Sequence, residues 1–217
     1  MAARAGFYAS GGKRGCDLVA SAVALLLLSP LLVVLLLVVR LTSSGPGFYR
    51  QERVGRGGRT FRLVKFRSMY PDADQRGLPL TSAGDPRITP VGRILRRTKL
   101  DELAQLWNVL VGDMSIVGPR PEVPQYVALY SAAQREVLSV RPGLTDPASI
   151  AYRYEEELLR GCADPDRCYR EVILPDKLDM SLQYLRDISF WRDLAVVCRT
   201  MSSLFSPSHV VPRQSTF

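Results

Sequence analysis

The clearest pattern in the sequence is one long apolar segment near the start of the chain. Residues Leu18 to Val39 carry no charged side chain over 22 positions, and a helix of that length can span a bilayer. The segment is too long for the apolar part of a cleaved signal peptide, and no small-residue cleavage motif follows it. We therefore predict a membrane region over residues 1–45.

Ser29-Pro30 interrupts this segment near its middle. Proline removes a helical hydrogen bond and clashes with the preceding turn, and the Ser29 hydroxyl can donate to a carbonyl that Pro30 leaves free. Lys13 and Arg14 precede the segment and Arg40 follows it, so the positive-inside rule places both flanks on the cytoplasmic side. A bent, re-entrant helix satisfies both flanks, whereas a kinked spanning helix satisfies one. The pattern alone leaves both arrangements open.

The remaining pattern predicts a mainly helical α+β domain over residues 46–205, followed by a polar tail over residues 206–217. A strand is expected at Arg59–Met69, after the glycine-rich turn Gly55–Gly58. Periodic apolar positions predict helices at Val91–Leu110, Gln125–Leu138, Glu155–Arg160, Leu178–Arg186 and Ser189–Phe205. Glycine and proline indicate turns or loops at Ser43–Gly47, Pro71–Pro90, Val117–Pro124 and Arg141–Gly143.

The last of these helices has a continuous apolar stripe. Its members are Phe190, Trp191, Leu194, Val197, Cys198, Met201, Leu204 and Phe205. Such a stripe usually packs into a protein core. Beside a membrane anchor, a helix lying in the lipid interface is a fair competitor to that interpretation.

Positive charge is concentrated in the first third of the chain. Of the 217 residues, the first 67 hold eleven Lys and Arg against Asp17 and Glu52, although the whole chain has a formal net charge of only +8. This local excess suits anionic lipid or phosphorylated ligands, and no nucleic-acid-binding motif accompanies it. With one histidine and no CxxC pair, a zinc site is disfavoured. A Cys162–Cys168 pair is disfavoured in a chain with cytoplasmic features.

Asp101 and Glu102 are the strongest candidates for chemistry. They follow Thr98 as in a capping box, and acidic residues in a first helical turn often only offset the helix dipole. Here, however, four cations crowd the preceding residues: Arg93, Arg96, Arg97 and Lys99. Either a salt-bridge network or a site for a phosphate and a metal fits this setting, and nearby arginines would depress the pKa of a carboxylate nucleophile.

Other cations stand in restricted backbone. Arg120 lies between two prolines, and Arg141 precedes Pro142-Gly143, so either guanidinium could be pre-oriented for a phosphate. Lys65 and Arg67 alternate along the predicted strand and would point to the same side.

Together these segments resemble the bacterial sugar transferases of the monotopic phosphoglycosyl transferase superfamily, in their minimal form. The matching motifs are LLLLSPLLVVLLLVV, YRQERVGRGGRTFRLVKFRSM, ITPVGRILRRTKLDELAQLWNVLVGDMSIVGPRPE, RPGLTDPASI and SFWRDL, over roughly residues 10–205. The resemblance implies a re-entrant helix broken at Ser29-Pro30, a small β-hairpin, and interfacial helices around an active site on the cytoplasmic face of the bacterial membrane.

The resemblance also implies a reaction. Members move a sugar 1-phosphate from a UDP-sugar to polyprenol (undecaprenyl) phosphate, releasing UMP and initiating glycoconjugate or exopolysaccharide assembly. Asp101 matches the nucleophile of a covalent, ping-pong intermediate, and Glu102, with Asp101, matches the Mg²⁺ site. Substrate contacts are expected from Lys65, Arg67, Arg96, Arg120, Arg141 and Arg153. A homodimer and downstream glycosyltransferases are further partners to consider.

One segment departs from the family pattern. Where many relatives have glycine after the RPGLT motif, this chain has Asp146-Pro147-Ala148-Ser149-Ile150, which bears on the identity of the sugar rather than on the chemistry. Two other functional classes remain: a non-catalytic membrane protein that recruits a partner, and a membrane-tethered nucleic-acid binder. The first has no need of Asp101 and Glu102 inside a cation cluster, and the second leaves the Pro-Arg-Pro sequence unexplained.

Overall fold

The computed structural model describes residues 8–73, 81 and 84–205. The predicted tail, residues 206–217, and part of the predicted loop at Pro71–Pro90 lie outside the described residues. Within the described part, helices predominate and are accompanied by two two-stranded sheets. This confirms the mainly helical α+β class.

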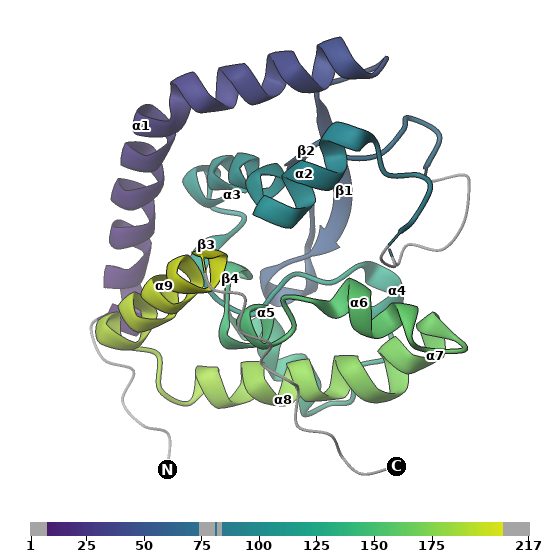
Figure 1. Ribbon diagram of the computed structural model, residues 1–217. Helices are drawn as coiled ribbons and strands as arrows, with labels where there is room; N and C mark the ends of the chain where they lie inside the picture. The colour runs from purple at the N-terminus through teal and green to yellow at the C-terminus, as the bar shows by residue number, and fades with distance from the viewer. Residues whose placement is uncertain (1–7, 74–80, 82–83, 206–217) are drawn as a thin grey trace.

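The apolar segment forms helix α1 (Lys13–Thr42), which follows the short turn η1 (Tyr8–Gly12). Figure 1 shows α1 turning a corner part-way along its length, with the rest of the described chain lying between its two arms. Pro30 stands inside the helix, and the Ser29 hydroxyl donates to the Leu26 carbonyl at 2.8 Å. Leu26 is the residue whose carbonyl Pro30 would otherwise have bonded, so the sequence-based expectation for Ser29 is confirmed and Pro30 explains the bend.

Most of α1 is exposed. Its buried residues are Asp17, Ser21, Leu35 and Val39, and in the described part of the chain α1 is the one helix long and apolar enough to cross a membrane. Leu35 and Val39 pack against Phe66, Leu95 and Ala104 in one cluster. The second arm of α1 is therefore joined to the domain by a hydrophobic core, while the rest of its apolar surface is available to lipid.

The predicted strand is β2 (Thr60–Phe66), and it pairs in antiparallel register with β1 (Phe48–Val54). The turn between them, η2 (Arg56–Gly58), places Gly57 at a φ of 69°, a conformation that favours glycine. The hairpin is thus confirmed.

The prediction of one continuous helix at Val91–Leu110 is wrong. The chain forms α2 (Pro90–Thr98), the 3₁₀ helix η4 (Leu100–Gln105) and α3 (Leu106–Val111). The break falls at Lys99, whose φ of 59° is left-handed. Neither glycine nor proline marks this position, so the apolar spacing continued through a break that the sequence does not announce.

A second correction concerns the middle of the chain. Instead of one helix at Gln125–Leu138, the structure has the short helix α4 (Pro124–Val127) and the 3₁₀ helix η5 (Gln134–Ser139). The predicted turn after Arg141 leads at once into β4 (Gly143–Thr145), which pairs in parallel with β3 (Ser115–Val117). These strands are too short to show an alternating pattern.

The C-terminal helices agree better with the sequence. They are α5 (Pro147–Ala151), α6 (Glu155–Arg160), α7 (Pro165–Cys168), η6 (Tyr169–Ile173), α8 (Leu174–Leu185) and α9 (Phe190–Phe205). The predicted bounds of α6 are confirmed, and α8 begins earlier than expected. Val196 of α9 is buried, whereas Trp191 is 74% exposed. Val196, however, lies outside the predicted stripe. Of the stripe itself, Phe190, Leu194 and Met201 are also exposed, and Val197 packs at the edge of a core cluster, so the stripe lies mainly on the surface.

The structure joins the sulfurs of Cys162 and Cys168, whose Cα atoms are 6.3 Å apart. The sequence disfavoured this pair on grounds of compartment, but the turn between α6 and α7 brings the two residues together.

Candidate active site

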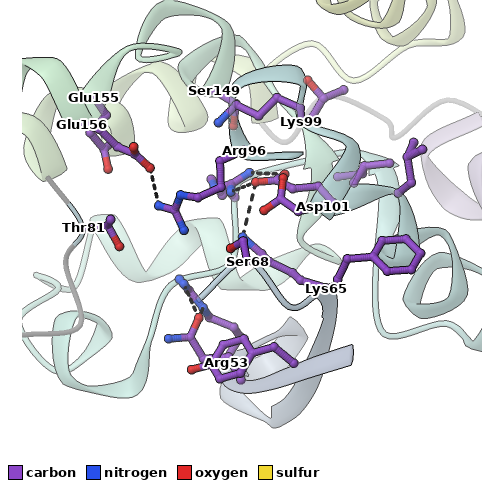
Figure 2. Close-up of a pocket in the computed structure, with 18 of the residues that line it drawn as sticks. Arg53, Lys65, Ser68, Thr81, Arg96, Lys99, Asp101, Ser149, Glu155 and Glu156 are labelled. Carbon is purple, nitrogen blue, oxygen red and sulfur yellow. Dashed lines mark hydrogen bonds and ion pairs between the residues drawn. The ribbon is translucent and has the colours of Figure 1, made fainter. Parts of the chain in front are cut away.

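A cavity of about 790 Å³ lies between the hairpin, η4 and the C-terminal helices. Asp101 and Glu102 line it, together with Lys65, Arg96 and Arg120. Figure 2 shows Lys99 and Ser149 on one side of Asp101, and Lys65 and Arg53 on the other. Segments far apart in the sequence thus meet around the predicted acidic pair.

Asp101 is held at the start of η4, directly after the left-handed turn at Lys99. Its side chain is 4% exposed, and its Oδ1 has no hydrogen-bond partner among the described residues. Burial raises the pKa of Asp101, and the charge of Glu102 adds to the rise. The expectation of a depressed pKa is therefore wrong for the protein without ligands, because burial outweighs the nearby cations.

Glu102 has the opposite setting. Its carboxylate accepts two hydrogen bonds from Arg120, at 2.6 and 3.2 Å, and one from Lys65 at 3.3 Å. Burial alone would raise the pKa of Glu102, but the charges of Arg120 and Lys65 outweigh it and hold the pKa well below its usual range. Two adjacent carboxyl groups are therefore pushed in opposite directions, which is a common arrangement in active sites.

The predicted capping box at Thr98 is absent. The Thr98 hydroxyl donates to the Ile94 carbonyl at 2.8 Å, and η4 has no side-chain cap. Thr98 belongs to the last turn of α2, so Asp101 is not held as part of a helix cap. The capping-box explanation for its position is therefore wrong, although Asp101 and Glu102 do stand in the first turn of η4.

Lys65 and Arg67 both line the cavity, but they make different contacts. Burial lowers the pKa of Lys65 to about 8, although Glu102 opposes the change. Arg67 donates to the carbonyl oxygens of Ser43 and Val39, at 2.7 and 3.3 Å. Arg67 therefore holds the end of α1 against the site.

Of the remaining predicted cations, Arg96 and Arg153 line the cavity. Arg96 forms an ion pair with Glu156, and Arg153 donates weakly to the Leu204 carbonyl at 3.5 Å. Arg141 is not among the lining residues; its Nε donates to the Gly112 carbonyl at 2.8 Å. The structure brings together every predicted site residue of the catalytic domain except Arg141.

Several lining residues were missed by the sequence reasoning. Glu122, Tyr169 and Lys177 are buried at the cavity wall, where the Tyr169 hydroxyl donates to Glu122 and Lys177 Nζ lies 2.8 Å from Glu155. Arg53 donates to the Pro121 carbonyl at 2.9 Å. Only Glu122 had a sequence signal, because it directly follows the Pro-Arg-Pro segment.

The acidic side chains of the cavity bear on the predicted Mg²⁺ site. Among the described residues, no three His, Cys, Asp or Glu side chains form a group that could hold a metal. Mg²⁺, however, often takes one or two carboxylates and completes its shell with water and substrate phosphate oxygens. The unpartnered Asp101 Oδ1, next to the Glu102 carboxylate, fits a site of that kind.

Comparison with known proteins adds an independent finding. The model of the bacterial sugar transferase family matches residues 8–207. The chain is 41% identical over 197 residues to a UDP-glucose:undecaprenyl-phosphate glucose-1-phosphate transferase of Caulobacter vibrioides, covering 89% of this chain and 70% of the relative. It is 34% identical over 207 residues to the exopolysaccharide production protein ExoY of Rhizobium meliloti, covering 88% and 84%.

Some relatives are much longer. A UDP-N-acetylgalactosamine-undecaprenyl-phosphate N-acetylgalactosaminephosphotransferase of Aeromonas hydrophila is 36% identical over 200 residues, which are 89% of this chain and 44% of that protein. The chain thus spans less than half the length of this relative.

Proposed function

Because the chain belongs to the bacterial sugar transferase family, we propose that it transfers a sugar 1-phosphate from a UDP-sugar to undecaprenyl phosphate. The names of the relatives support both substrates. The cavity supports the chemistry, because it combines buried carboxylates with an excess of cations suited to a diphosphate.

In the first step, a carboxylate oxygen of Asp101 attacks the phosphorus that carries the sugar. A bond forms between Asp101 and phosphorus, the bond to the UMP oxygen breaks, and UMP leaves with the electron pair. The observation that carries this assignment is the buried Asp101 Oδ1, which has no partner among the described residues. In the second step, the phosphate of the lipid attacks the same phosphorus and frees Asp101.

The neighbouring charges have distinct tasks. Arg120 and Lys65 contact Glu102 and stand where the negative charge of the diphosphate develops, so they stabilise the transition state. A Mg²⁺ ion held by Asp101 and Glu102 would neutralise diphosphate charge when bound. Deprotonation of Asp101, whose pKa is raised by burial, is favoured by any cation that enters with the donor.

We further propose that α1 is re-entrant, with both flanks and the cavity on the cytoplasmic side. The bend in α1 (Figure 1), the Ser29–Leu26 bond and the basic residues at both ends support this topology. It would place Asp101 at the level of the lipid phosphate. The domain division at residues 45 and 205 stays a prediction.

The decisive test is incubation of the purified chain with UDP-glucose, UDP-galactose or UDP-N-acetylgalactosamine and Mg²⁺, without lipid. Intact mass should reveal one phosphosugar adduct, and UMP should appear in equal amount. Asp101→Asn should form no adduct while keeping its thermal melting temperature. An Asp101→Asn protein that turns over at near the wild-type rate would contradict the assignment of the nucleophile.

A further inference from the structure

The cavity has a second end, formed by α5 and α9, whose polar groups are not used in the donor chemistry. The Ser149 hydroxyl and Arg153 Nη1 are both buried at this end, and neither has a hydrogen-bond partner among the described residues. Buried donors are normally satisfied, and two residues that line one cavity and carry such donors are suited to an anion. Figure 2 shows Ser149 on the same side of Asp101 as Lys99.

Lys99 adds a cation within electrostatic reach of Asp101. Its charge lowers the pKa of Asp101, against the larger effect of burial, and it makes no ion pair with any residue that the structure describes. Lys99 has a left-handed backbone at the end of α2, and it is one of the residues that line the cavity. Ser149, Arg153 and Lys99 thus offer three free donors on one side of the nucleophile.

The wall next to these donors is apolar. Ile150 of α5 and Val197, Met201 and Leu204 of α9 line this end of the cavity. Met201 both lines the cavity and is 51% exposed to solvent, so we place the mouth of the cavity at this residue. An opening of this kind accepts a ligand with a charged head and an apolar chain.

The outer surface of α9 continues the same character. Leu194 and Trp191 are exposed on it, at 42% and 74%. Thr145 of β4 and Thr200 of α9 share a hydrogen bond of 2.7 Å, which holds α9 beside the end of β4, just before α5 begins. A chain leaving the cavity past Met201 therefore meets an apolar helix face rather than water.

From these observations we infer that the α5–α9 end of the cavity is the subsite of the lipid acceptor, with Ser149, Arg153 and Lys99 on its phosphate and Met201 at the mouth for its prenyl chain. The inference rests on the proposed function. An oxygen of the bound phosphate forms the new bond to phosphorus, the bond from phosphorus to Asp101 breaks, and its electron pair returns to the carboxylate. No oxidant or further reactant is needed.

The two half-reactions allow a direct test. Ser149→Ala should raise the KM for undecaprenyl phosphate about tenfold, as expected for one lost hydrogen bond to a charged group. Met201→Glu should raise it about tenfold or more, because a carboxylate then stands in the apolar mouth. Both variants should form the phosphosugar adduct from the UDP-sugar at rates within about threefold of the wild type. A residue that stabilised the transition state of the donor step would instead lower this rate by about a hundredfold or more when substituted.

The matched control is Leu194→Glu. It places the same charge on the exposed face of α9, but Leu194 is not among the residues that line the cavity. Met201→Glu should raise the KM for undecaprenyl phosphate more than Leu194→Glu does. With a short-chain isoprenyl phosphate, which has less prenyl chain to pass the mouth, the KM values of the two variants should differ less.

Four outcomes would overturn the inference. Equal losses in the Met201 and Leu194 variants would mean a general effect on membrane binding. Slower adduct formation in Ser149→Ala, in step with slower transfer, would assign this end to the donor. If both cavity variants form the adduct and transfer it at wild-type rates, the inference is refuted and the proposed function stands. If the wild-type chain forms no adduct, the proposed function is refuted, and the inference with it.

Discussion

At the scale of single residues, the site depends on contrasts between neighbours. Asp101 and Glu102 are adjacent, yet burial raises the pKa of one and cations lower the pKa of the other. The left-handed turn at Lys99 produces this contrast, because it ends α2 and starts a new helix that places both carboxylates in the cavity. Function here follows from one backbone angle as much as from residue type.

Lys65 gives a prediction at this scale. Its pKa of about 8 means that the ammonium is charged below that pH and neutral above it. If the charge stabilises the diphosphate, adduct formation should decline as pH rises through about 8. Lys65→Arg should move this decline to higher pH, because a guanidinium stays charged above pH 12. The rate of adduct formation in a single turnover, measured between about pH 6.5 and about pH 9.5, would show this decline.

Thermal melting over the same pH range serves as the control. An unchanged melting temperature together with falling adduct formation would locate the effect in the site. A flat rate profile for the wild type across pH 8 would contradict the role of Lys65.

The sequence predicted these residues unevenly, for a physical reason. Asp101, Glu102 and Arg120 stand in local motifs, so adjacency in the chain reveals them. Tyr169 of η6 and Lys177 of α8 line the cavity where both contact Glu122, the residue after the Pro-Arg-Pro segment. No spacing along the chain encodes that packing, and a buried lysine on an amphipathic helix looks like any surface lysine.

At the scale of elements, the parallel pair of β3 and β4 is unusually close. A Cβ atom built on Gly143 would lie 2.1 Å from the backbone nitrogen of Gly118. Gly143→Ala should therefore lower the free energy of unfolding by about 2 kcal/mol through overpacking. Thermal melting in detergent should show the loss.

Gly11→Ala is the matched control for this change. Nothing lies within 4 Å of a Cβ at Gly11, so its melting temperature should stay near that of the wild type. Equal melting temperatures for the Gly143 and Gly11 variants would contradict the close contact between the strands.

The topology of α1 is a second prediction at this scale. In a chain whose native cysteines are replaced by serine, Gly11→Cys should resist a membrane-impermeant maleimide in intact cells and react after lysis. Arg59→Cys, on the exposed hairpin turn, is the cytoplasmic control and should behave in the same way. A re-entrant helix gives matching patterns, because both flanks then share one side.

Labelling of Gly11→Cys in intact cells, with Arg59→Cys protected, would instead establish a spanning helix.

Sequence reasoning reached the same pair of alternatives for α1, a re-entrant or a spanning helix. It located Ser29-Pro30 and the basic flanks correctly, but missed the breaks at Lys99 and between α4 and η5, where no glycine or proline interrupts the apolar spacing.

At the scale of the whole molecule, α1 is part of the catalytic framework rather than a detachable tether. At its first arm, Arg14 donates to the Val109 and Leu110 carbonyls at 2.6 and 2.9 Å. At its second arm, Leu35 and Val39 pack against Ala104, three residues after Asp101. The membrane helix is thus joined at both ends to the segment that carries the nucleophile.

Arg67 provides the test of this coupling. Its guanidinium donates to the Val39 and Ser43 carbonyls at the end of α1, where a helix has unsatisfied acceptors. Removing these bonds in Arg67→Ala should cost about 2 kcal/mol of stability, lower the melting temperature and slow adduct formation together. Arg40→Ala, which removes an exposed charge from the same turn of α1, should change neither. If Arg67 acted only as a substrate contact, its loss would raise the KM for the UDP-sugar while the melting temperature stayed unchanged. That result would contradict a coupling through Arg67 between the second arm of α1 and Asp101.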